Sequence, residues 1–454
     1  MRLLSCALAL VLVCVATPAS AEPKLIATLN IPSDGHDKAP ATEGVLENGV
    51  AGDLLGGIGS GMAYAGGHTF LMLPDRGPNA KTYNPAVDNT SSYIPRFHTF
   101  ELTLIPQSAG LPFSVAADLK ATQLLSSSSP LVYGDGKAAG LGPARPALNT
   151  HGHSYFVGRS DSFDAQKLST NPDNARLDPE SIRVANDGRT VFISDEYGPN
   201  IYQFDRATGR RLKSFSIPDR FAVTKVSAKG DDEIAGNTSG RVANKGMEGL
   251  AISPDGKTLT GIMQSPLLQD GGTKAGVVRL LSFDIASGIT HEYAFPLTSV
   301  GSAEKPKYTG VSDIVALNDH QFLVDERDGK GRGDGAAAVF KHLALIDLNG
   351  AADVSDVSGE AALSAKAVHK VTAIDLVATL VAGGISAGDI PGKIEGVTFG
   401  FDVVLHGQTL HTLWVVSDND FLTSVDGVAN PNSLYVIGFT DADLADYMPQ
   451  GLAQ

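Results

Sequence analysis

The apolar residues of this chain gather in short runs separated by turn residues. The clearest runs are Thr69–Pro74, His98–Ile105, Thr190–Ser194, Ile201–Asp205, Thr258–Met263, Val277–Asp284, Gln321–Val324, Leu343–Asp347, Thr412–Val416 and Ser433–Phe439. Each is rich in Val, Ile, Leu and aromatic residues and is bounded by Gly, Asp, Asn or Pro, as β-strands are. Helical periodicity is scarce, and the best helical segment, Val371–Val381, is short enough to be an insertion. The pattern predicts an all-β protein.

One sequence motif recurs along the chain. It consists of an acidic residue, a predicted hairpin and, after the hairpin, a polar cluster, here named the second polar cluster. Its acidic residues are Glu180, Glu248, Asp313 and Glu395, each placed just before an apolar strand position. A first, divergent copy occupies residues 57–79. Self-similarity at a long period indicates a repeat architecture, and short strands without helices indicate a propeller.

The spacing of the second polar clusters sets the expected number of blades. These clusters begin at positions 75, 195, 264, 325 and 418, and the first interval is wide enough to hide one more unit. Six units would average about 72 residues, which suits a four-stranded blade with its loops. We therefore predict a six-bladed β-propeller over residues 22–454, while five or seven blades also fit.

The first 21 residues have the pattern of a cleavable secretion signal. Arg2 precedes an apolar run at residues 3–16, and Ala19-Ser20-Ala21 suits a signal peptidase. The run is too short to cross a bilayer, and no later segment reaches the roughly 20 apolar residues that a transmembrane helix needs. We expect an exported monomer, periplasmic or secreted, without a membrane span.

Composition excludes several kinds of chemistry. Both cysteines, Cys6 and Cys14, lie in the predicted signal, so the remaining chain has no disulfide, thiolate metal site or cysteine nucleophile. The net charge of −15 argues against a nucleic-acid partner. Ser60 stands one position late for a complete Gly-x-Ser-x-Gly elbow, which argues against a serine hydrolase.

The repeated acidic residues predict a metal site. Innermost strands of a propeller line one channel, so equivalent positions converge there. Carboxylates that meet within a few ångströms repel one another unless a cation or protons intervene. Oxygen-only ligands favour Ca²⁺ or Mg²⁺ over zinc, and we assign Ca²⁺ to Glu180, Glu248, Asp313, Glu395 and Asp418. Alternatively, these acids bind backbone amides at blade junctions.

The second polar clusters predict the remaining functional residues. Arg76 and Arg327, with Asn79, are natural clamps for a phosphate or carboxylate group. Glu196 and Asp195 are best placed for catalysis, with Glu196 taking the proton from an attacking water. Such residues after a strand are also ordinary turn formers.

Four stretches of the sequence together carry a resemblance to a known family. They are GGIGSGMAY…FLMLPDRGPN at 56–79, LDPESIRV…VFISDEYGPNIYQFD at 177–205, NKGMEGLAISPDGKTL at 244–259 and KIEGVTF…LWVVSDND at 393–420. With them the chain resembles the phytase-like family of exported bacterial proteins, described by an "esterase-like activity of phytase". The resemblance implies a propeller and the hydrolysis of esters or phosphoesters.

The sequence thus leads to one expected function and two alternatives. We expect a calcium-assisted hydrolase of phosphate or carboxylic esters that acts on a small molecule. The alternatives are a propeller that binds a ligand or partner without catalysis, and a metal-dependent lactonase.

Overall fold

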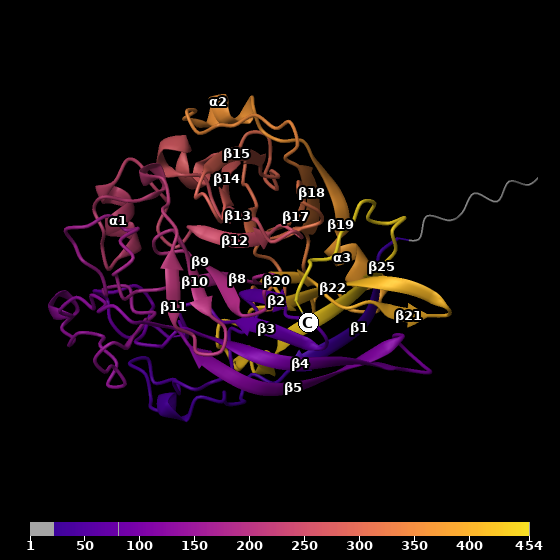
Figure 1. Ribbon diagram of the computed structural model, residues 1–454, viewed down its shortest axis with the longest axis horizontal. Coiled ribbons are helices and arrows are strands. Elements are labelled where there is room, and N and C mark those ends of the chain that lie inside the picture. The colour runs from indigo at the N-terminus through magenta and orange to yellow at the C-terminus, as the bar shows by residue number, and fades with distance from the viewer. Residues whose placement is uncertain (1–21, 80, 454) are drawn as a thin grey trace, which may run out of the picture.

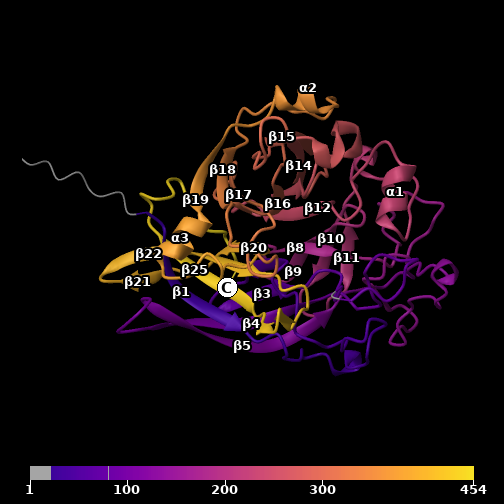
Figure 2. The same cartoon turned by 180° about the vertical axis from the view of Figure 1, so that it is seen from behind.

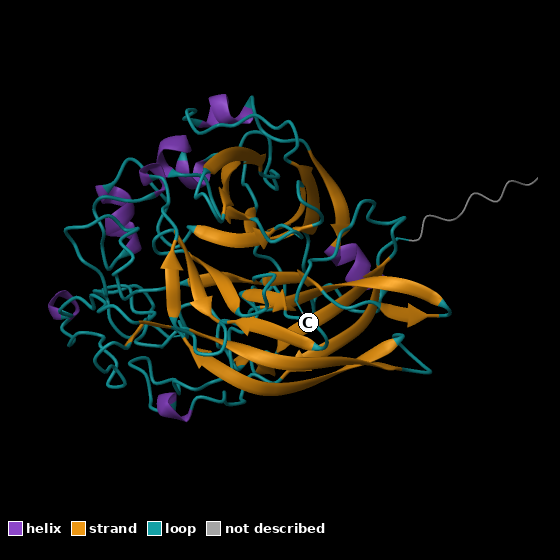
Figure 3. Cartoon of the chain, viewed as in Figure 1, coloured by secondary structure: helices purple, strands orange, loops and turns teal. Residues whose placement is uncertain are grey.

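Five antiparallel sheets stand around a common centre in the computed structural model, which describes residues 22–79 and 81–453 (Figures 1 and 3). Blade 1 consists of β2 (Gly61–Tyr64), β3 (Thr69–Leu73), β4 (Arg96–Pro106) and β5 (Phe113–Leu124). Blade 2 consists of β8 (Pro179–Val184), β9 (Thr190–Asp195), β10 (Asn200–Asp205) and β11 (Arg211–Ser214). Blade 3 consists of β12 (Met247–Ile252), β13 (Thr258–Met263), β14 (Val277–Asp284) and β15 (Thr290–Pro296). Blade 4 consists of β16 (Gly310–Ala316), β17 (Gln321–Arg327), β18 (Lys341–Asp347) and β19 (Lys370–Asp375).

Blade 5 joins the two ends of the chain. It consists of β20 (Ile394–Phe399), β22 (Gln408–Ser417), β25 (Asn432–Phe439) and β1 (Lys24–Ile31), with β21 (Val403–Leu405) beside β22. The N-terminal strand β1 pairs antiparallel with β25, so the last blade is completed by the first strand. Such radial closure leaves only short edges on each sheet.

The innermost strands of the blades, β2, β8, β12, β16 and β20, contact one another in a ring. Of these, β2, β8 and β20 lie near the middle of the view (Figure 1). Apolar side chains fill the space between neighbouring sheets, as where buried Trp414 of blade 5 packs on Phe70 of blade 1 with ring centroids 4.6 Å apart. This arrangement confirms the predicted β-propeller.

The number of blades is five, which is one of the alternatives that the spacing left open, and not the preferred six. The stretch between β5 and β8, where a sixth blade would have to lie, holds loops, a 3₁₀ turn and the two-residue strands β6 (Ser126–Ser127) and β7 (Ser154–Tyr155), not a sheet of blade size. This segment packs apolar side chains such as Phe156 onto the core between blades 1 and 2. It therefore extends two existing blades.

The ten predicted strand segments all overlap observed strands, whereas the predicted helix is only half right. Residues Lys370–Asp375 form β19, and the helix α3 (Leu376–Ala382) begins where Asp375 Oδ1 accepts a bond of 2.9 Å from Ala378 N. The α-helices α1 (Gly230–Gly236) and α2 (Glu360–Ser364) lie at the periphery in both views (Figure 2). Short 3₁₀ turns occur at Pro40–Thr42, Lys137–Ala139, Asp219–Phe221, Leu268–Asp270 and Gly272–Lys274, and a small hairpin pairs β23 (Ser424–Val425) with β24 (Val428–Ala429). Among the described residues, no helix is long and apolar enough to cross a membrane.

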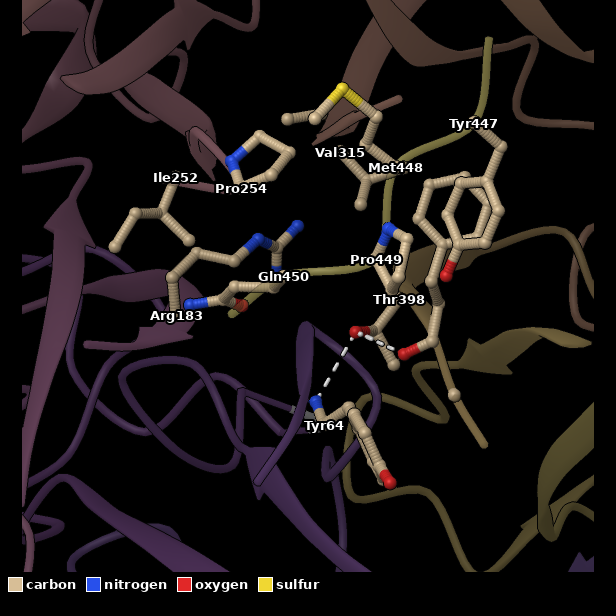
Figure 4. Close-up of a pocket in the computed structure, with 13 residues that line it drawn as sticks. Tyr64, Arg183, Ile252, Pro254, Val315, Thr398, Tyr447, Met448, Pro449 and Gln450 are labelled. Atoms are coloured by element: carbon tan, nitrogen blue, oxygen red, sulfur yellow. Dashed lines mark hydrogen bonds between the residues drawn. The ribbon is translucent and has the colours of Figure 1, made fainter. Parts of the chain in front are cut away.

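The C-terminal segment crosses the channel at the end where the innermost strands finish. Met448 N donates to Leu317 O at 2.8 Å, Gly451 N to Pro254 O at 3.0 Å, and Ala453 N to Asn186 O at 2.7 Å. These acceptors lie in the turns after β16, β12 and β8, so the segment spans three blades. A cavity of only about 60 Å³ remains beneath it, between Arg183 and Gln450 (Figure 4). The opposite end of the channel holds the acidic residues.

Candidate functional site

Three of the four repeated acids lie at the beginnings of innermost strands. Glu180, Glu248 and Glu395 are the second residues of β8, β12 and β20, and all three are buried. Each innermost strand pairs antiparallel with the next strand outward, as where Pro179 of β8 lies opposite Asp195 of β9. The residues that follow β3, β9, β13, β17 and β22 therefore emerge at the same end of the channel as these acids.

Together these elements form a buried group of carboxylates, here named the acidic centre. Its members are Asp75, Asp178, Glu180, Glu196, Glu248, Glu395, Asp418 and Asp420. Asp420 is half-buried and the others are buried. The basic residues that pair with these carboxylates are Arg76, Arg327 and Lys393. They are distributed unevenly, so that, within the described part of the chain, some of the carboxylates have a cationic partner and others have none.

The first acidic group comprises Asp178, Glu180 and Glu196, which offer oxygens that all lie within 4.8 Å of one another. Arg76 neutralises only one edge of this group: its Nη1 donates to Asp178 Oδ2 at 2.6 Å and its backbone N to Asp178 Oδ1 at 3.0 Å. Burial, followed by the charges of Glu248 and Asp178, raises the pKa of Glu180 well above its ordinary value. Burial and the charge of Asp178 raise the pKa of Glu196 to about 7. The group thus carries uncompensated negative charge when ionised.

Glu248 adjoins the first acidic group and has one free oxygen. Its Oε1 accepts a bond of 2.6 Å from Gln264 Nε2, and Gln264 Oε1 in turn accepts one of 3.0 Å from Lys245 Nζ. Its Oε2 is buried and has no hydrogen-bond partner among the described residues. Burial, then repulsion from Glu196 and other carboxylates, raises the pKa of Glu248 well above its usual range. A buried oxygen without a donor is costly, which indicates that something else binds it.

The second acidic group comprises Asp75, Asp418 and Asp420, whose oxygens likewise lie within 4.8 Å of one another. This group contains its own cation, because Lys393 Nζ donates to Asp418 Oδ2 at 3.0 Å and to Asp420 Oδ1 at 2.7 Å. The same ammonium lies 3.8 Å from Glu395 Oε1. Burial acts to raise the pKa of Asp418, but Lys393 and hydrogen bonds outweigh it and lower that pKa.

Both predicted arginine clamps are paired with carboxylates of the acidic centre. Arg327 Nη2 donates to Glu395 Oε1, and its Nε donates to Ser312 Oγ at 2.7 Å. Arg76 pairs with Asp178 as described above, so neither guanidinium is free of an acidic partner. Asn79, the third residue predicted to bind substrate, is partly exposed in the loop after β3.

Asp195, predicted as catalytic, is saturated by donors of the turn after β9 and of the residue before β8. It accepts bonds from Asp178 N and Tyr197 N, each at 3.1 Å, and from Gly198 N at 3.0 Å and Asn200 Nδ2 at 3.2 Å. This carboxylate shapes the loop that carries Glu196, which is the ordinary turn role that the sequence left open.

Asp313 occupies the repeat position of the other acids but lies in a different network. It accepts bonds from Ser181 Oγ at 2.9 Å, from Arg183 Nη2 at 2.8 and 2.9 Å, and from Val397 N at 3.0 Å. Arg183 also donates to Met62 O at 2.7 Å, so the pair links strands of four blades across the channel. The structure therefore separates Asp313 from the acidic centre, and its occupied oxygens argue against a role as a metal ligand.

The loop that carries Glu196 is held from behind by a buried ion pair. Arg241 donates to Tyr197 O from Nε at 3.0 Å and from Nη2 at 2.8 Å, and it pairs with Glu233 of α1. Tyr197 Oη donates to Gly158 O at 2.8 Å. These bonds fix the position of the Glu196 carboxylate relative to its neighbours.

Sequence reasoning missed several members of the site. Asp178 stands two residues before Glu180, and Lys393 two residues before Glu395. Their closeness to the repeated acidic residues could have identified both from the sequence. Position 264 entered the sequence analysis only as the start of a polar cluster, with no role for Gln264 itself. Lys245 has no equivalent in the other repeats that would have marked it. Their roles depend on side chains that meet across blades.

Comparisons with known proteins agree with the resemblance seen in the sequence. Residues 53–421 match the family model "Phytase-like: Esterase-like activity of phytase". A protein of Arthroderma benhamiae, named an uncharacterized secreted protein, is 36% identical over 197 residues, which is 37% of this chain and 38% of the relative. The chain thus matches well under half the length of that relative.

Solved structures with a similar course of the chain have low identity. A putative 6-phosphogluconolactonase of Bacteroides uniformis is 14% identical, with a TM-score of 0.31 over 92% of this chain and 100% of that chain. A periplasmic gluconolactonase of Pseudomonas aeruginosa is 12% identical, with a TM-score of 0.32 over 91% of this chain and 99% of that chain. The family match spans most of the propeller and its acidic centre, and the chain therefore belongs to the phytase-like family.

Proposed function

We propose that this protein is an exported hydrolase of phosphate or carboxylic esters that works with a calcium ion in its acidic centre. The observation that supports this most is the convergence of Asp178, Glu180 and Glu196 within 4.8 Å, beside the unpartnered Oε2 of Glu248. The description of the family by an esterase-like activity is consistent with ester hydrolysis.

The residues of the first acidic group suit a hard divalent cation. The ligand atoms offered are all carboxylate oxygens, which Ca²⁺ prefers and binds in sets of six to eight with water or carbonyl oxygens. The raised pKa values of Glu180 and Glu248 arise from burial and mutual repulsion, both of which a bound cation would relieve. Asp178, Glu180 and Glu248 would hold the ion, with Glu196 beside them.

Calcium would supply Lewis-acid chemistry, withdrawing charge from a phosphoryl or acyl oxygen and making a bound water more acidic. Glu196 is the proposed proton acceptor, because its carboxylate oxygen lies within 4.8 Å of the Asp178 and Glu180 oxygens that would hold the ion. Its carboxylate is positioned by a bond of 3.2 Å from Gly246 N to Oε1 and by the supported Tyr197 loop. Asp195 contributes by shaping that loop, and Arg76 by orienting Asp178.

Export is the remaining part of this proposal. The predicted signal, residues 1–21, lies outside the described residues, and the fungal relative is named a secreted protein. Calcium is plentiful outside cells, so an oxygen-only site in the extracellular affinity range would stay occupied there.

Turnover assays test the function directly. The purified protein is assayed on p-nitrophenyl phosphate, a p-nitrophenyl ester, a lactone and phytate, with calcium and with a chelator. We expect turnover of an ester that the chelator abolishes, and a loss of about 10²-fold or more in kcat for Glu196→Gln. Glu101→Gln, an exposed acid on β4, is the matched control and should leave kcat unchanged.

Two outcomes would contradict the proposal. Absence of turnover on every substrate, with a calcium-dependent rise in melting temperature, would favour a propeller that binds a ligand without catalysis. Turnover of the lactone alone would favour a lactonase.

A further inference from the structure

A pocket beside the acidic centre differs from it in charge. Its cavity of about 230 Å³ lies between blades 3 and 4 and is lined by residues before β12, after β13, before β16 and after β17. Among these residues are Lys245, Lys307 and Arg327, opposed by Asp328. We infer that this pocket binds an anionic group of the ligand, such as a phosphate or carboxylate, next to the reacting ester.

Among the described residues, two of the three cations of the pocket have no carboxylate within ion-pair distance. Asp328 Oδ1 lies 3.6 Å from Lys341 Nζ, and Arg327 pairs with Glu395. Within the described residues, neither Lys245 nor Lys307 forms an ion pair with a carboxylate. Two ammonium groups without acidic partners at one cavity, in a chain of net charge −15, form a site that attracts anions.

The rest of the lining combines apolar residues such as Leu297 and Val311 with hydroxyl groups that suit an oxyanion. The hydroxyl-bearing side chains of Ser265, Thr273 and Tyr308 line the same cavity. Hydroxyl donors and ammonium groups are the partners that phosphate and carboxylate oxygens take in proteins. A neutral apolar ligand would leave these groups without partners, which is unfavourable.

A chain of hydrogen bonds connects the pocket to the acidic centre. Lys245 Nζ donates to Gln264 Oε1 at 3.0 Å, and Gln264 Nε2 donates to Glu248 Oε1 at 2.6 Å. One amide side chain therefore separates the ammonium from the carboxylate with the unpartnered oxygen. A cation bound at the centre would attract an anion in the pocket, and by linkage each would raise the affinity of the other.

This inference rests on the proposed function only in naming the ligand as the substrate. Under that function, the preferred substrates are esters that carry a second negative charge away from the reacting bond. Monoanionic esters and neutral lactones would not engage the two lysines and would have a higher KM.

Binding of inorganic phosphate tests the pocket without any reaction. Phosphate is titrated calorimetrically into the purified protein in buffer with a chelator, and into the double variant Lys245→Gln, Lys307→Gln. We expect phosphate binding at least tenfold weaker in the double variant, with its melting temperature unchanged. Lys225→Gln, an exposed lysine outside the pocket, is the matched control and should bind as the parent does.

Failure of this inference is distinguishable from failure of the proposed function. Equal phosphate affinity in parent and double variant, or no phosphate binding by the parent, overturns the pocket whatever the turnover assays show. Lysine-dependent phosphate binding without turnover of any ester supports the pocket and contradicts the hydrolase.

Discussion

The two acidic groups at one end of the channel contain the same kind of residue but differ in how their charge is balanced. In the group of Asp75, Asp418 and Asp420, the ammonium of Lys393 lies 3.0 Å from Asp418 Oδ2 and 2.7 Å from Asp420 Oδ1. Asp178, Glu180 and Glu196 have Arg76 only at the Asp178 edge. The group of Asp178, Glu180 and Glu196 is therefore the one in which a cation from solution would balance the charge.

This difference shows that converging carboxylates do not by themselves make a metal site. A buried carboxylate needs a compensating charge, and a covalently attached ammonium supplies it as well as an ion does. Lys393 balances the charge of the second group without an ion from solution. The first group has no such lysine among the described residues, and it is there that we propose a calcium ion binds.

Removing the built-in cation should have the largest effect. Lys393→Met leaves the carboxylates of the second group without their partner, and we expect a loss of about 3 kcal/mol in the free energy of unfolding, the lower end for a buried pair because the lysine side chain is 37% exposed. Chemical denaturation in the presence of a chelator measures it. Calcium should restore part of the loss, because the ion would take the place of the ammonium.

Lys38→Met, at an exposed lysine, is the control for this variant and should leave stability unchanged. If Lys393→Met were as stable as the parent in chelator, the second group would not depend on its internal cation, and the contrast between the two groups would fail.

Calcium removal should have the next largest effect, and only through the first group. At a calcium concentration 100 times the Kd, binding stabilises the folded parent by about 2.7 kcal/mol, seen as a rise in melting temperature. Glu248→Gln removes one carboxylate ligand and should reduce that rise. In chelator the same variant should melt no lower than the parent, because it also removes a buried like charge.

Glu101→Gln again serves as the control and should keep the full response to calcium. An unchanged calcium response in Glu248→Gln would mean that the ion binds elsewhere or that the acidic residues of the first group are structural.

The pH dependence of stability would distinguish the two acidic groups further, but buried His98 also contributes to it and has to be measured first. Burial, with a smaller effect of Arg96, lowers the pKa of this ring from 6.5 to about 3. Between these values the unfolded chain takes up a proton that the folded protein does not, so stability is present above pH 6.5 and is lost as the pH falls. The expected slope is about 1.4 kcal/mol per pH unit.

His98→Gln should remove this slope between pH 6 and pH 4, as measured by denaturation in chelator over a series of pH values. What pH dependence remains then belongs mainly to the carboxylates. The same slope in variant and parent would show that His98 does not titrate as its burial implies.

The sequence by itself determined the strands, the repeat and several carboxylates of the site. Period-two apolar runs identify strands because alternate side chains must be buried, and repeated positions of a propeller converge by symmetry. Glu180, Glu248 and Glu395 could therefore be placed in the channel from spacing alone, and the structure brings them there.

Only the tertiary structure decided the number of blades and the partner of each carboxylate. The stretch between β5 and β8 forms loops that pack on blades 1 and 2, and its only strands are the two-residue β6 and β7. Asp313 shares its repeat position with Glu180 but meets Arg183, which reaches across the channel from β8. Lys393, the residue before β20, meets Asp418, the residue after β22. Partners of this kind come from strands far apart in the chain, and local sequence contains no record of which side chain will face which.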